Sequence, residues 1–141
     1  MADGRGRRIL IVSNDEQRLA ALRELFEHDG YSISTTWSGR DALAELQSEH
    51  FDGVMVDDYV PDLYVGQFIE RASQIPFRPC VIVVRAHQSR DEVRHFGAPG
   101  TFWLIEKAGP AEMVKAAESA LRQGNSGRSI EDRAGANGHG H

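Results

Sequence analysis

The chain has 141 residues, enough for one domain with a single substantial core. Its formal net charge of -5 argues against nonspecific nucleic-acid binding, because phosphate contacts need clustered lysine and arginine. No apolar stretch approaches the roughly 20 residues of a membrane span, and nothing resembles a secretory signal. We therefore expect a cytoplasmic protein without membrane or nucleic-acid contacts. The lone Cys80 is expected to be a small buried apolar side chain.

Five segments of the sequence predict β-strands. Four are short continuous apolar runs, Ile9–Val12, Val54–Val56, Val81–Val84 and Phe102–Ile105, which is the pattern of strands covered on both faces. The fifth, Tyr31–Trp37, alternates and is more polar, which favours a strand nearer a sheet edge.

Helical patterns lie between and after these strands. Apolar residues at three- and four-residue spacing predict helices over Glu16–His28, Gly39–Ser48, Leu63–Ala72 and Pro110–Leu121, and a weaker pattern predicts one over Gln88–Phe96. Strict alternation of strand and helix predicts an α/β fold, a doubly wound, five-stranded parallel sheet with five helices.

Composition divides the chain into three parts. Residues 1–7 carry most of the basic stretch RGRR (Arg5–Arg8) and are expected to form a flexible arm, and residues 8–122 are expected to form the domain. Residues 123–141 are rich in Gly, Ser and Asn and nearly free of apolar residues, so they cannot offset their own ordering entropy. We expect a disordered tail there.

Polar and charged residues follow the predicted strands, where parallel sheets collect their ligands. A strand-end carboxylate near a lysine has two interpretations, a structural ion pair or a nucleophilic or metal-binding group with an electrostatic helper, and the spacing leaves both open. No second general acid or substrate pocket is visible, which argues against an enzyme. The strand-end residues are Ser13, Asn14, Asp15, Asp57, Asp58, Arg85 and Lys107.

The order of these motifs carries a resemblance. The stretch RILIVSNDEQRLAALRELFEHDGYSISTTWSGRDALAELQSEHFDGVMVDDYVPD resembles the receiver domain of bacterial response regulators, with similarity from about Arg8 to Leu121. The resemblance implies a flavodoxin-like receiver fold with strand order 2-1-3-4-5. Because Pro61 lies four residues after Asp57, it implies that Asp57 is the phosphoacceptor, and it places Lys107 on the lysine that contacts the phosphoryl group.

The same resemblance shows where this chain departs from the family. Ser13 and Asn14 stand at the acidic pair that usually holds Mg²⁺, and Asp15 matches the acidic residue that often follows it. Mg²⁺ prefers carboxylate oxygens, so we expect weak or absent binding by Asp57, Asp15 and the Asn14 carbonyl oxygen. Arg85 replaces the usual Thr or Ser. It either pairs with Asp57 or is a solvated surface cation.

Two functions follow, both in two-component signal transduction. The first is a stand-alone atypical response regulator of a phosphorelay, in which Asp57 accepts a phosphoryl group from a sensor histidine kinase or phosphotransfer protein, with output through a downstream protein or a homodimer. The alternative is a pseudo-receiver that acts as a phosphorylation-independent interaction module. In either case we expect an interaction face on the fourth helix, fifth strand and fifth helix, with charged residues Asp91, Arg94, Glu112 and Lys115.

Overall fold

The computed structural model describes residues 6–57, 59–85 and 102–123. These residues form a five-stranded sheet with the order β2-β1-β3-β4-β5, and every neighbouring pair is parallel. The predicted fold and strand order are confirmed. The strands are β1 (Arg8–Val12), β2 (Ser32–Thr36), β3 (Gly53–Asp57), β4 (Cys80–Arg85) and β5 (Trp103–Glu106).

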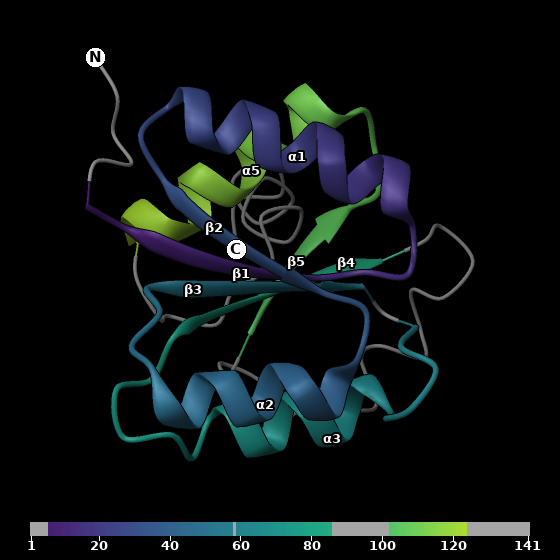
Figure 1. Cartoon of the computed structure of the whole chain (residues 1–141), viewed down its shortest axis with the longest axis vertical. Coiled ribbons are helices and arrows are strands. Elements are labelled where there is room, and N and C mark those ends of the chain that lie inside the picture. The colour runs from purple at the N-terminus through teal and green to yellow at the C-terminus, as the bar shows by residue number, and fades with distance from the viewer. Residues whose placement is uncertain (1–5, 58, 86–101, 124–141) are drawn as a thin grey trace, which may run out of the picture.

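Helices cover both faces of the sheet (Figure 1). Helices α1 (Glu16–His28) and α5 (Pro110–Gln123) lie side by side on one face, and α2 (Gly39–Ser48) and α3 (Val65–Ala72) lie on the other. Each face buries its own apolar cluster against the central strands, so β1, β3 and β4 are covered on both sides. The faces of these strands are therefore closed to solvent, and only residues at the strand ends can reach it.

The edge position predicted for the alternating segment is confirmed. Strand β2 pairs with β1 alone, and its burial runs from exposed at Ser32 through buried at Ile33 to partly buried residues beyond. Cys80 begins β4 and is buried, as expected for a small apolar side chain. Among the described residues, no helix is long and apolar enough to cross a membrane.

Two predicted helix boundaries differ from the structure. Helix α3 begins at Val65 rather than Leu63, because Leu63 pairs with Val60 in an isolated antiparallel bridge that closes the preceding loop. Helix α5 continues to Gln123, beyond the predicted Leu121. The predicted helix over Gln88–Phe96 lies outside the described residues, as do Asp58, Asp91, Arg94 and nearly all of the predicted arm and tail.

Candidate functional site at the carboxyl edge of the sheet

The carboxyl ends of β1 and β3 bring Ser13 and Asp57 together. The two strands are neighbours, with Val12 paired to Val56, so the residue after each pair emerges at the same edge of the sheet. The Ser13 hydroxyl donates to Asp57 Oδ2 at 2.7 Å, and Ser13 is only 3% exposed. Ser13 is therefore a neutral hydrogen-bond donor to Asp57, at a position where the family resemblance implies an acidic residue.

The other oxygen of the same carboxylate bonds to an arginine of α1. Arg18 Nη1 donates to Asp57 Oδ1 at 2.7 Å, and the two side chains are 11% and 17% exposed. A charge-assisted hydrogen bond of this length between poorly solvated groups is stronger than an exposed surface pair. Both oxygens of Asp57 are thus engaged by side chains of the chain itself.

Arg18 is held in place by Asp15, the residue that caps α1. The Arg18 backbone N–H donates to Asp15 Oδ1 at 3.1 Å, and Arg18 Nη2 donates to Asp15 Oδ2 at 3.4 Å. The backbone N–H of Arg18 is the main cause that lowers the pKa of Asp15; burial opposes it, and the charges of Arg18 and Lys107 add to the lowering. Asp15, Arg18 and Asp57 therefore form one ionic network, in which the arginine lies between two carboxylates.

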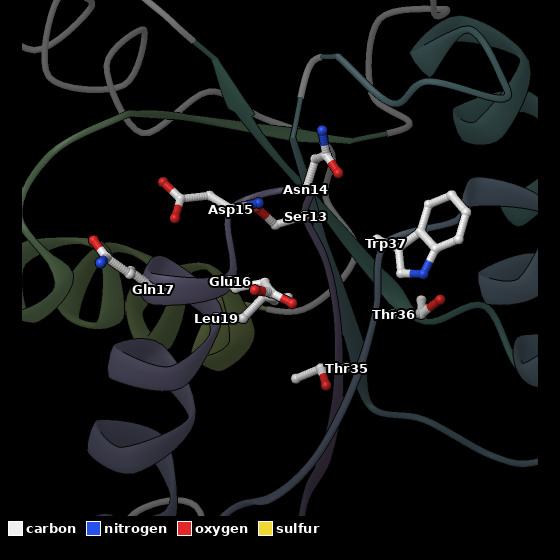
Figure 2. A pocket seen from close by; sticks show the side chains of 9 residues that line it. All are labelled: Ser13, Asn14, Asp15, Glu16, Gln17, Leu19, Thr35, Thr36 and Trp37. Carbon is white, nitrogen blue, oxygen red and sulfur yellow. The ribbon is translucent and has the colours of Figure 1, made fainter.

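A surface pocket borders this network (Figure 2). It lies between the loop that follows β1, with Ser13, Asn14 and Asp15, and the end of β2, where Trp37 stands on the far side. The Asn14 and Asp15 side chains point in different directions in this view, and both residues are exposed. The two groups expected to help Asp57 hold a metal thus diverge.

The donor set at this edge does not fit a Mg²⁺ ion. Magnesium requires near-octahedral oxygen ligands with carboxylates among them, whereas Asp57 bonds to a hydroxyl and a guanidinium. A guanidinium also repels a divalent cation placed at the same carboxylate. Among the described residues, no group of three or more His, Cys, Asp or Glu side chains is arranged to hold a metal ion.

Arg85 lies at the end of β4 and is buried, at 1% exposed. Its Nη2 donates to Glu106 Oε2 at 3.3 Å, across the β4–β5 pair. The interpretation of Arg85 as a solvated surface cation is therefore wrong. The guanidinium on Asp57 Oδ1 comes from Arg18 of α1. Helix α1 lies on the opposite face of the sheet from α2 and α3 (Figure 1).

Lys107 follows β5 and is exposed. Its backbone N–H donates to the Arg85 carbonyl oxygen at 3.0 Å, which fixes the position of the residue at the sheet edge. Its charge is close enough to contribute to the lowered pKa of Asp15. The contact of its side chain with a phosphoryl group on Asp57 stays a prediction.

Two charged residues at this edge, the basic Arg18 and the acidic Asp62, were not among the site residues predicted from the sequence. The signal for Arg18 is its spacing: it precedes the buried Leu22 and Phe26 at four-residue intervals, so it starts the core-facing stripe of α1. Side chains of a helix point toward its N-terminus, and here that end faces the carboxyl edge of the sheet. An arginine at this position is directed at the strand ends.

Asp62 caps α2 from the loop that follows β3. Its carboxylate accepts bonds from the Ser38 hydroxyl at 2.8 Å and from the backbone N–H groups of Gly39 and Arg40 at 2.8 and 3.1 Å. Burial alone raises the pKa of Asp62, but these three donors outweigh it and the pKa is lowered from its ordinary 3.8. The carboxylate ties the loop after Asp57 to the first turn of α2.

Most of the chain matches the model of one protein family. Residues 9–118 match the model described as "Response regulator receiver domain". The response regulator ArlR of Staphylococcus aureus is 25% identical over 115 residues, which are 81% of this chain and 52% of ArlR. The chain spans about half the length of the curated relatives it matches.

Solved structures agree on the fold. A response regulator receiver protein from Sinorhizobium medicae superposes with a TM-score of 0.71 at 20% identity, covering 86% of this chain and 98% of that one. The response regulator TrrA of Thermotoga maritima, solved in complex with Mg²⁺ and BeF, has a TM-score of 0.67 at 19% identity, covering 82% and 98%. At this level of identity the likeness supports the fold alone.

Proposed function

Because this chain belongs to the response regulator receiver domain family of two-component signalling, we propose that it is a receiver that signals by protein contact, with Asp57 held in an internal ion pair. Receivers are in general signalling modules rather than enzymes, they commonly bind Mg²⁺ at an acidic pocket, and they interact with histidine kinases or phosphotransfer proteins. The proposal makes this chain a phosphorylation-independent variant of that scheme.

The observation that carries the proposal is the engagement of both Asp57 oxygens. Phosphoryl transfer to an aspartate requires a nucleophilic carboxylate oxygen to attack phosphorus, and a cation to neutralise the phosphoryl oxygens. Here Ser13 donates to Oδ2, Arg18 donates to Oδ1, and the guanidinium draws negative charge away from the nucleophile. The carboxylate is held as a structural anion.

Protein contact as the output is supported by exposed aromatic side chains at the same edge. Trp37 after β2, Tyr59 after β3 and Tyr64 before α3 are 61%, 71% and 71% exposed. Aromatic residues are enriched in protein interfaces, because they bury a large area at little cost in conformational entropy. The exposed Glu112 and Lys115 of α5 remain part of the expected interaction face, for a downstream protein or a second copy of the chain.

A second candidate function is phosphoacceptance at Asp57, in an atypical response regulator receiver. It is favoured by the place of Asp57 at the end of β3 with a side chain 17% exposed, within reach of a small donor, and by the retained Lys107. In this scheme Arg18 and Ser13 would have to release the carboxylate before attack. The kinase or phosphotransfer partner would supply the phosphoryl group.

Intact-mass spectrometry separates the two functions. The wild-type chain is incubated with acetyl phosphate and Mg²⁺, and the mass is followed over time, with Asp57→Asn as the matched control. The proposed function predicts that neither protein gains mass. Rapid addition of one phosphoryl group to the wild type, absent from Asp57→Asn, would replace the proposed function by the second candidate.

A further inference from the structure

Arg18 of α1 lies against the carboxylate of Asp57, the aspartate that the sequence predicts as the acceptor. We infer that its guanidinium is a resident cation, built into α1, that takes the place of the divalent metal at Asp57. The inference rests on the proposed function and deepens it, because it names the group that keeps the carboxylate neutralised. It differs from the sequence-based expectation, in which the loss of the acidic pair and the presence of Arg85 were the causes of weak metal binding.

The geometry gives the guanidinium two anionic partners at once. Nη1 reaches Asp57 Oδ1 at 2.7 Å and Nη2 reaches Asp15 Oδ2 at 3.4 Å, so one cation bridges the carboxylates that a metal would have to share. The planar, permanently charged guanidinium of arginine suits this bridging role. A metal ion at Asp57 Oδ1 would have to displace Nη1 or bind beside a positive charge.

The position of Arg18 is fixed before any ligand arrives. Its backbone N–H is bonded to the cap residue Asp15, and Leu22 and Phe26 anchor the same stripe of α1 in the core. The side chain is 11% exposed, so little of its charge is screened by water. A tethered cation of this kind does not dissociate, whereas Mg²⁺ would have to bind from solution.

Two causes of weak metal binding make different predictions. If the missing acidic donors alone are responsible, Ser13→Asp with Asn14→Asp restores binding whatever residue stands at 18. If Arg18 is the resident cation, the acidic pair restores binding only when the guanidinium is removed as well. The two sets of substitutions are then strongly non-additive, which a thermodynamic cycle measures.

The experiment measures Mn²⁺ affinity by paramagnetic broadening of amide resonances in four proteins: wild type, Arg18→Met, the double acidic variant, and the triple variant. Arg23→Met is the matched control, because Arg23 lies on the same helix and pairs with Glu27 at an exposed site, with both side chains 49% exposed. Arg18→Lys in the acidic background tests whether charge alone is sufficient. Far-UV circular dichroism confirms that each variant is folded.

The expected result is a gain of about tenfold or more in Mn²⁺ affinity when Arg18→Met is added to the acidic pair, from the removal of one like charge beside the metal. Arg23→Met in the same background should change the affinity by less than about twofold, since an exposed charge that distant is screened. Arg18→Lys should keep the affinity low. If the acidic pair alone binds Mn²⁺ as tightly as the triple variant, the inference is wrong.

The result can be distinguished from a failure of the proposed function. If the wild type accepts a phosphoryl group from acetyl phosphate and the metal cycle still shows the expected dependence on Arg18, the proposed function fails and the resident cation stands. If the wild type stays unmodified and the acidic pair alone binds Mn²⁺ as tightly as the triple variant, the resident cation fails, and the missing acidic donors explain the metal behaviour.

Discussion

Arg18 and Asp57 are 39 residues apart in the sequence, and a 2.7 Å hydrogen bond joins Arg18 Nη1 to Asp57 Oδ1. The bond links the first turn of α1 to the end of β3, across the edge where parallel sheets bind their ligands. Ser13 completes the arrangement from β1. Asp57, which the sequence predicts as the acceptor, is thereby bonded to the helix that covers this face of the sheet.

Removing the guanidinium should destabilise the domain. Arg18→Met leaves a poorly solvated carboxylate at Asp57 without its charged donor, and we expect a loss of about 1.5–3 kcal/mol in the free energy of unfolding. Arg23→Met removes an exposed pair on the same helix and should cost no more than about 0.5 kcal/mol. Urea denaturation of the three proteins measures the difference. Equal losses for the two substitutions would mean that the Arg18–Asp57 pair contributes nothing specific.

Asp62→Ala should destabilise α2. The substitution removes the acceptor for the Ser38 hydroxyl and for the Gly39 and Arg40 N–H groups, and loss of a helix cap typically costs about 0.5–2 kcal/mol. The neighbouring Asp41, an exposed acidic residue in the same first turn of α2, provides the control as Asp41→Ala. Chemical denaturation and amide exchange in the first turn of α2 measure the effect. Unchanged exchange at Gly39 and Arg40 would contradict the capping role.

Asp62 should also make part of the stability dependent on pH. Its folded pKa is lowered below the ordinary 3.8, so the folded state favours the ionised form. The contribution is fully present above 3.8 and is lost as the pH falls through the folded pKa. The difference in unfolding free energy between wild type and Asp62→Asn should therefore be largest at neutral pH and shrink in acid. A difference that grows on acidification would show that the sign is wrong.

Cys80 should be inert in the folded protein. Burial raises the pKa of its thiol to about 12, and the reactive thiolate is scarce at any pH where the protein is handled. We expect slow reaction with Ellman's reagent in buffer and rapid reaction in concentrated urea, followed by absorbance. Reaction at the same rate in both solutions would mean that the start of β4 opens readily.

The sequence was sufficient to predict most of the fold. Continuous apolar runs identify β1, β3, β4 and β5 because both faces of these strands are buried, and the alternation of Tyr31–Trp37 identifies the edge strand β2. The start of α3 was not predictable from periodicity, since Leu63 fits the apolar stripe of the helix yet closes the preceding loop with Val60. Local pairing overrode the helical pattern there.

The site was predictable only in part. The strand ends place Ser13 next to Asp57, which follows from parallel pairing of β1 with β3. The contact between Arg18 and Asp57 depends on how α1 packs against the sheet. This tertiary packing cannot be predicted from the residues that follow the strands. Arg85 follows a strand and was therefore predicted as the competing cation, whereas Arg18 stands at the start of the buried stripe of α1, away from any strand end.

We propose that Asp57 is a structural anion rather than a phosphoacceptor. The intact mass of the wild-type chain after prolonged incubation with acetyl phosphate and Mg²⁺ shows directly whether Asp57 accepts a phosphoryl group. We expect no gain in mass, as for Asp57→Asn treated in the same way. Gain of a single phosphoryl group by the wild type, lost in Asp57→Asn, would contradict it.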